Sequence, residues 1–292
     1  MRKVVYMQHT VKIGFHVSIA GGISNAPRAA VEKGYSAFQF FPSSSRSWSV
    51  AKASIEEGEK FRKLVKENGL EAFAHVPYLC NPASPDKAVL EKSKNMLIED
   101  MEICSGAGVK HMVVHMGSHK GEGKERGISM IVGTLGYALD KVKDVELLLE
   151  NSAGYTNSMG SDFAEIGKVL DLLGRGKVGV CLDTCHAFAA GYDFGSKESI
   201  EKLASEINDY IGLEKLKLIH LNDAKYPLGS GLDRHWHIGK GYIGEKGFIN
   251  FFENKAFNHG NFILETPYQS EGDDARNLNE VKKLMGLSGI KL

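Results

Sequence analysis

Short apolar runs alternate with longer amphipathic stretches along almost the whole chain, and this rhythm limits the fold more than any other feature. The short runs, rich in β-branched and aliphatic residues, predict strands, whereas the amphipathic stretches predict helices. The predicted strands are Lys12–His16, Ala37–Phe41, Glu71–His75, His111–His115, Val145–Glu150, Val178–Asp183, Leu216–His220 and Asn261–Glu265. Helices are predicted between them, for example over Ser54–Asn68, Pro85–Gly106, Asp162–Leu173, Ser196–Tyr210 and Asp274–Met285.

This alternation is typical of repeated βα units, whose strands run parallel. Eight such units favour a closed barrel over an open doubly wound sheet. No Pro/Ser-rich linker or low-complexity tract divides the 292 residues. We therefore expect a single (β/α)8 TIM barrel over residues 1–292, with about residues 1–11 as an N-terminal extension. In this fold the active site lies where the C-terminal ends of the strands meet, an end of the barrel termed the mouth below.

Composition excludes few classes of protein. Hydrophobic residues make up 42% of the chain and charged residues 25%, which are ordinary values for a globular protein. No run approaches the roughly 18 apolar residues of a membrane span, and the first residues lack the apolar core of a secretory signal. Four cysteines in a chain of this length do not indicate a disulfide framework, so we expect a cytoplasmic protein. We also expect it to be a monomer.

The last residues of the predicted strands are the positions most informative about function. Seven of these eight residues bind metals or transfer protons in other proteins, although the strand interiors are almost wholly apolar. The seven are His16, His75, His115, Glu150, Asp183, His220 and Glu265. Two local clusters add further donors, because His186 follows Asp183 by one helical turn and Asp233 and His235 alternate along an extended loop.

Nine of these side chains form a candidate set of metal ligands: His75, His115, Glu150, Asp183, His186, His220, Asp233, His235 and Glu265. Imidazoles and carboxylates without thiolates suit zinc, manganese or iron in catalytic sites. Taken singly, a strand-end His is more often structural and a terminal Asp is often a helix cap. Taken together, so many unpaired charges at one mouth require compensation by cations. Nine ligands fit two or three ions.

The remaining histidines are interpreted differently. His111 opens its strand at the far end of the barrel, and His9 and His259 lie in polar segments, so these three are expected to be structural or at the surface. The roles of His119 and His237 stay open.

The formal net charge is zero, with 36 Lys and Arg against 36 Asp and Glu. A global basic field therefore gives no support for a nucleic-acid partner, although a local basic rim could still contact phosphates. The predicted loops at the mouth carry six basic side chains, each of which could equally be a solvated surface charge: Arg46, Lys120, Lys124, Lys225, Arg234 and Lys240.

The donor residues lie within longer motifs that occur in a fixed order along the chain. These are Gly14-Phe-His-Val-Ser, His115-Met-Gly-Ser-His119, Glu150-Asn-Ser-Ala-Gly154, Gly179-Val-Cys-Leu-Asp-Thr-Cys-His186, His220-Leu-Asn-Asp-Ala-Lys225, Asp233-Arg-His235 and Leu264-Glu-Thr-Pro267. Together they resemble the endonuclease IV family of abasic-site DNA repair enzymes, over about residues 14–285.

The resemblance implies a (β/α)8 barrel that holds three zinc ions. Mn²⁺ or Fe²⁺ could substitute, because His and carboxylate sites accept several first-row ions. The first ion would bind His75, His115 and Glu150; the second Glu150, Asp183, His220 and Glu265; and the third His186, Asp233 and His235. Glu150 and Glu265 are the expected catalytic carboxylates, which would orient the attacking water. The products would be a 3′-hydroxyl and a 5′-deoxyribose phosphate, and blocked 3′ ends would also be trimmed.

The same resemblance implies double-stranded DNA with abasic sites or blocked 3′ ends as the partner. Arg46, Tyr78 and Leu79 would then contact the DNA, with side chains that fill the gap left by a missing base. A sugar isomerase or epimerase that uses a divalent metal on the same barrel is the alternative, since a fold alone does not fix function. A second alternative is a metal-loaded barrel that binds damaged DNA without cutting it. Tests with an abasic oligonucleotide and with ketose sugars separate these hypotheses.

Overall fold

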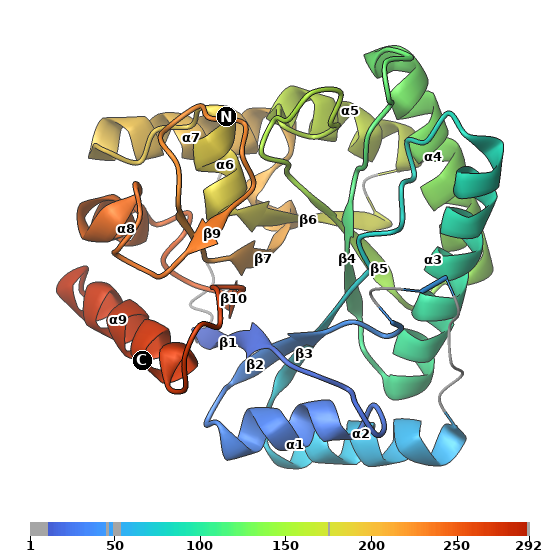
Figure 1. The fold of residues 1–292 in the computed structure, drawn as a ribbon, viewed down its shortest axis with the longest axis horizontal. Coiled ribbons are helices and arrows are strands. Elements are labelled where there is room, and N and C mark those ends of the chain that lie inside the picture. The colour runs from blue at the N-terminus through green and yellow to red at the C-terminus, as the bar shows by residue number, and fades with distance from the viewer. Residues whose placement is uncertain (1–10, 45–46, 49–53, 175, 291–292) are drawn as a thin grey trace.

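The computed structural model describes residues 11–44, 47–48, 54–174 and 176–290. In this part of the chain, parallel strands close into a barrel in the order β1-β10-β7-β6-β5-β4-β3-β2 (Figure 1). The barrel strands are β1 (Lys12–His16), β2 (Ala37–Phe40), β3 (Glu71–His75), β4 (His111–His115), β5 (Glu146–Glu150), β6 (Val178–Asp183), β7 (Leu216–His220) and β10 (Asn261–Leu264). The predicted (β/α)8 barrel is confirmed.

Helices surround the barrel and cover its outer face (Figure 1). They are α1 (Asn25–Glu32), α2 (Ile55–Glu67), α3 (Lys87–Ala107), α4 (Lys124–Lys141), α5 (Phe163–Leu173), α6 (Thr184–Ala190), α7 (Lys197–Tyr210), α8 (Gly244–Glu253) and α9 (Asp273–Leu287), with a 3₁₀ turn at Leu213–Lys215. Side chains fix where several of them begin: Ser54 accepts a hydrogen bond from the Glu57 backbone N–H, and Asp86 accepts from the first turn of α3. None of the helices within the described ranges is long and apolar enough to cross a bilayer.

The predicted element boundaries agree closely with the structure. Five of the strands coincide with their predicted ranges, and the five helices given as examples differ by no more than two residues at either end. The differences fall on residues that flank the elements: Phe41, Val145 and Glu265 lie just outside their strands. Such positions end or begin the hydrogen-bonded ladder, where a sequence pattern alone is least informative.

The inside of the barrel holds a buried layer of apolar side chains: Ala37, Phe73, Val113, Leu148, Cys181, Leu218 and Ile263. Side chains alternate between the two faces of a strand, so the residue two positions further along also faces the barrel axis. Those next positions hold Gln39, His75, His115, Glu150, Asp183, His220 and Glu265. The sequence therefore builds a polar layer at the mouth directly above an apolar one.

Strand β1 completes the inner layer with Gly14, which has no side chain. A Cβ added at this position would lie 1.7 Å from the carbonyl oxygen of Ala37 on β2. The close approach of these two strands therefore requires glycine.

A two-stranded antiparallel ribbon lies outside the barrel sheet, formed by β8 (Asp223–Ala224) and β9 (His235–Trp236). In Figure 1, β9 lies close to α6. The buried Asp223 carboxylate accepts hydrogen bonds from the backbone N–H groups of Gly241 and Ile243, at 2.9 and 3.0 Å. These bonds fix the loop after β9. The ribbon was not predicted, and it carries the segment that contains Asp233 and His235.

Candidate metal centre

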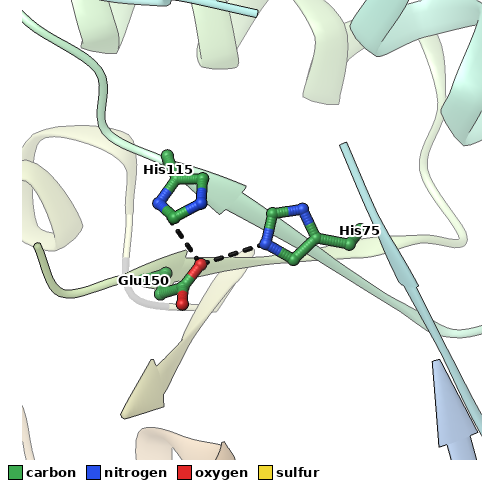
Figure 2. Close-up of side chains that lie close together, drawn as sticks. All are labelled: His75, His115 and Glu150. Atoms are coloured by element: carbon green, nitrogen blue, oxygen red, sulfur yellow. Dashed lines mark hydrogen bonds and ion pairs between the residues drawn. The ribbon is translucent and has the colours of Figure 1, made fainter. Parts of the chain in front are cut away.

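Glu150, at the end of β5, is the centre of the polar layer at the mouth. Its side chain is 1% exposed, and its Oε2 atom lies 3.0 Å from His75 Nε2 and 3.4 Å from His115 Nδ1. Figure 2 shows the two imidazole rings, which come from β3 and β4, approaching the same carboxylate. Three neighbouring strands thus bring a first group of donors together.

The second carboxylate oxygen of Glu150 belongs to another group. Glu150 Oε1 lies 2.9 Å from His220 Nδ1, at the end of β7. The same His220 nitrogen lies 3.4 Å from Glu265 Oε2 and 4.0 Å from Asp183 Oδ2. Glu150 is therefore placed to bridge two groups of donors.

The third group lies between the barrel and the ribbon. His186 lies in the first turn of α6. Asp183 caps the N-terminus of this helix, because its Oδ1 accepts a hydrogen bond from the His186 backbone N–H at 2.7 Å. His186 Nε2 lies 3.1 Å from Asp233 Oδ1, and His235 Nε2 lies 3.5 Å from that same oxygen. His235 Nε2 is also 3.5 Å from Asp183 Oδ2. Asp183 therefore borders both the second and the third group.

The donor atoms are close enough for three candidate metal sites. In each of three groups, one ligand atom per residue lies within 4.8 Å of all the others: His75, His115 and Glu150; Glu150, Asp183, His220 and Glu265; and Asp183, His186 and His235. The third group contains Asp183 where the family resemblance implied Asp233, although Asp233 lies within 3.5 Å of both histidines. The geometry thus brings all nine predicted side chains together.

Three of the histidines are oriented as metal ligands require. His75, His186 and His235 each place Nδ1 against a backbone carbonyl oxygen, at 2.7, 2.9 and 3.1 Å. A carbonyl oxygen only accepts, so in the neutral form of each ring Nδ1 carries the proton and Nε2 presents its lone pair to the site. The Nε2 atoms of His186 and His235 are buried and have no hydrogen-bond partner within the described residues. Buried nitrogen atoms that have a lone pair but no hydrogen-bond partner are suited to bind a metal ion.

The charges of the site favour ionised carboxylates. Burial alone would raise the pKa of Glu150, but the His115 and His220 rings outweigh burial and hold its pKa well below the usual range. Burial opposes a charged His186, yet Asp183 and Asp233 raise its pKa well above the ordinary value. Asp233 in turn has its pKa lowered to about 2, because His186 outweighs burial. Anionic oxygen donors are therefore available at neutral pH.

A cavity of about 410 Å³ opens over these donors. Its walls are formed by Tyr78, His115, His186, Asp233, Arg234, His235, Glu265 and Pro267. The cavity therefore gives a small polar ligand direct access to residues of all three candidate metal sites.

Of the three predicted DNA-contacting residues, Tyr78 lines this cavity. The Tyr78 side chain is 63% exposed, and its ring centroid lies 5.7 Å from those of His115 and Phe41. Leu79 follows it and is partly buried. Arg46 lies outside the residues that the structure describes.

The predicted basic residues at the mouth differ in their surroundings. Lys124 pairs with Glu165 at 3.2 Å, and Lys240 lies 3.8 Å from Glu245. Arg234 lines the cavity and donates to the backbone oxygen of Asp233 at 2.8 Å. Lys225 lies over the Trp236 ring, at 4.5 Å from its centroid, and Lys120 is exposed.

Histidines outside the ligand set have other neighbours. His111 Nε2 lies 3.3 Å from Glu146 at the start of β5, away from the mouth. His119 Nδ1 accepts from backbone N–H groups of its own loop, His237 lies against Asn277, and His259 lies beside Asn258. His9 lies outside the described residues.

Comparisons with known proteins assign the chain to a family. The family model of the xylose isomerase-like TIM barrel matches residues 27–285. A protein from Nitrosopumilus maritimus (strain SCM1), named probable endonuclease 4, is 42% identical over 280 residues, which cover 94% of this chain and 99% of that protein. This chain belongs to the endonuclease IV family.

Solved structures agree with membership of the endonuclease IV family. Endonuclease IV from Thermus thermophilus has a TM-score of 0.84 at 35% identity, covering 94% of this chain and 99% of that one. A D-tagatose 3-epimerase-like protein also aligns, with a TM-score of 0.71 at 17% identity over 95% of this chain. At that level of identity the likeness concerns the fold alone.

Sequence reasoning missed the amides that support the donors in this endonuclease IV homologue. Asn151 Oδ1 accepts from the Asp183 backbone N–H at 2.7 Å, and Asn222 donates to Asp183 Oδ2 at 2.7 Å. Gln39 contacts both His220 and Glu265. A signal was present in the sequence, because each amide lies on a barrel strand or within two residues of its C-terminal end, at the mouth.

Proposed function

We propose that this endonuclease IV homologue hydrolyses the phosphodiester bond on the 5′ side of abasic sites in double-stranded DNA. The products would be a 3′-hydroxyl and a 5′-deoxyribose phosphate, and the same site would trim blocked 3′ ends. The observation that carries the proposal is that nine His, Asp and Glu side chains, with Glu150 among them, lie close together beneath an open cavity.

We propose zinc as the metal, with three ions per chain and Mn²⁺ or Fe²⁺ as substitutes. The donor set supports this, because it contains imidazoles and carboxylates but no thiolate. The ligands would be divided as the family resemblance implies, with Asp183 a further neighbour of the third ion. When bound, such ions neutralise charge on the phosphate and allow water to ionise near neutral pH.

Two carboxylates of the chain are assigned the catalytic roles. Glu265 lines the cavity, and Glu150 lies beneath it with an exposed fraction of 1%. Both have pKa values below the usual range, since neighbouring histidines outweigh the effect of burial, so both are ionised at neutral pH. An ionised carboxylate accepts hydrogen bonds and can orient a water molecule for attack on phosphorus.

Binding of the damaged duplex is assigned to Arg46, Tyr78 and Leu79. Tyr78 supports this assignment through its exposed ring at the edge of the cavity. An aromatic or aliphatic wedge can occupy the space of a missing base, and unstacking costs least at a damaged nucleotide. Arg234, in the cavity wall, adds a phosphate contact.

We further propose that the chain acts as a single-domain monomer in the reducing cytoplasm. All four cysteines are buried and free, which suits a reducing compartment. The barrel elements extend from Lys12 to Leu287, and no described element forms a second globular unit.

A strand-nicking assay tests the proposed activity. The substrate is a labelled duplex with one abasic site, incubated with protein as purified, with chelator-treated protein, and with treated protein reloaded with zinc. We expect scission 5′ to the lesion in the first and third reactions, and no scission of an intact duplex. Binding without scission in zinc would instead support a damage-binding protein, and turnover of ketose sugars would support the isomerase alternative.

A further inference from the structure

Gln39 is a buried polar residue in the otherwise apolar strand β2. Its side chain is 0% exposed and lies among the donors at the mouth. The amide Nε2 donates to Glu265 Oε1 at 2.7 Å and lies 3.3 Å from His16 Nδ1. The amide Oε1 lies 2.8 Å from His220 Nε2. Every polar atom of the side chain is therefore engaged.

These contacts fix the orientation of the amide. An ionised carboxylate only accepts hydrogen bonds, so the group that faces Glu265 must be the NH₂ end of Gln39. The carbonyl end then faces His220, and because a carbonyl oxygen only accepts, His220 Nε2 must carry a proton. The lone pair of neutral His220 is consequently on Nδ1.

The Nδ1 atom of His220 is the one that faces the carboxylates. It lies 2.9 Å from Glu150 Oε1 and 3.4 Å from Glu265 Oε2. An unprotonated nitrogen and carboxylate oxygens at these distances require a cation between them, either a proton or a metal ion. The other oriented histidines present Nε2 and are held by backbone carbonyls, whereas His220 has the opposite tautomer and is held by a side chain.

We propose that Gln39 is a positioning residue that selects the Nδ1-binding tautomer of His220 and at the same time fixes the carboxylate of Glu265. One amide thereby orients two ligands of the same metal site, one at the end of β7 and the other directly after β10. The proposal rests on the proposed function only in taking this group as a metal site. Its test therefore measures zinc affinity and the protonation of His220 Nε2 directly, and it does not depend on DNA cleavage.

The main variant is Gln39→Met, which keeps the length of the side chain and removes both polar ends. We expect zinc affinity at the His220 group to fall about 10- to 100-fold, as measured by competition with a chromophoric chelator. In zinc-loaded protein with ¹⁵N-labelled histidine, the signal of a protonated His220 Nε2 should be lost or broadened. Gln39→Glu keeps an acceptor for His220, so it should retain the Nε2–H signal.

Gln269→Met is the matched control, because Gln269 is exposed and the hydrogen bond to Asp273 comes from its backbone N–H. This control should bind zinc as the unmodified protein does. Wild-type affinity and an unchanged His220 signal in Gln39→Met would overturn the proposal. So would an equal loss at all three metal sites together with a lower melting temperature, because that result indicates a purely structural role. If zinc binding behaves as expected but no abasic duplex is cut, only the proposed function fails.

Discussion

Glu150 Oε1 and His220 Nδ1 lie 2.9 Å apart, although 70 residues separate them in the chain. The contact joins the ends of β5 and β7, which are not neighbours in the barrel. The other oxygen of the same carboxylate contacts His75 and His115. One side chain therefore links two of the three candidate metal sites, and the first prediction follows from this arrangement.

Replacement of Glu150 by Gln should empty both sites that share it. The amide keeps the shape of the side chain but removes the charge and one of two acceptor oxygens. We expect the metal content to fall from about three ions per chain to about one, and the nicking rate to fall more than about 100-fold. Glu146→Gln is the control, because Glu146 opens the same strand and pairs with His111. Elemental analysis of both variants measures the difference, and full occupancy in Glu150→Gln would contradict the bridging role.

Replacement of Tyr78 by Ala should weaken binding of abasic DNA by about 1–3 kcal/mol, since the exposed ring would stack in the damaged helix. Tyr137→Ala provides a control, because Tyr137 is also exposed but lies on α4, outside the cavity. Equilibrium binding to abasic and intact duplexes gives the measurement. An equal loss of affinity for both duplexes would mean that Tyr78 does not probe the lesion.

Removal of metal should lower thermal stability as well as activity. Ions that bind only the folded chain stabilise it by about 4 kcal/mol at a thousandfold excess over their dissociation constant. For a chain of this size the melting temperature should fall by about 5–15 °C after chelation and recover on addition of zinc. Scanning calorimetry of both forms measures the change. An unchanged melting temperature would show that no tightly held ion was removed.

Asp100 should make folding stability depend on pH. Burial raises its pKa to about 7, and both carboxylate oxygens lack a hydrogen-bond partner among the described residues. Between about pH 4 and pH 7 the folded chain therefore binds more protons at this position than the unfolded chain, so this group lowers stability progressively as the pH rises.

The Asp100→Asn variant removes that titration. Relative to the unmodified protein, its free energy of unfolding should increase between pH 4 and pH 7 by about 2–4 kcal/mol and stay level above that range. Urea denaturation of both proteins at matched pH values provides the comparison. A difference that is the same at every pH would refute the raised pKa.

Replacement of Gly14 by Ala should destabilise the barrel. The added methyl group would overlap the Ala37 carbonyl oxygen, and the strands would have to separate. We expect a loss of more than about 2 kcal/mol in the free energy of unfolding. Gly133→Ala is the control: Gly133 lies within α4 and has open space where the methyl would be, so stability should rise by about 0.5–1 kcal/mol. Chemical denaturation of the two variants should thus give opposite signs.

The sequence predicts the barrel and much of the candidate site because both follow one simple periodicity. Each of His75, His115 and Glu150 ends an apolar run, and the same parity that buries Phe73, Val113 and Leu148 points these residues along the barrel axis. Their convergence therefore follows once the strands are known to be parallel and closed.

Other features depend on contacts that no periodicity encodes. Gln39 lies two residues after Ala37 and so points to the same face of β2. Its role becomes visible only when the structure places His220 and Glu265 at the two ends of its amide. Asp100 lies on the same buried face of α3 as Ser93, Met96 and Leu97. From the sequence alone, however, a charged residue in a helix is expected to face solvent. The short ribbon was missed because two-residue strands give no alternation to recognise.

The ribbon also gives the third candidate metal site a distinct character. His186 lies in α6, which follows β6 directly, whereas His235 opens β9 and Asp233 lies two residues before it, in the ribbon outside the barrel. An ion bound between them would link the β8–β9 ribbon to the barrel, as a disulfide bond links two segments of a chain. Loss of that ion would release the segment that places Arg234 in the cavity wall. The affinity for substrate would then decline before the other two candidate metal sites were affected.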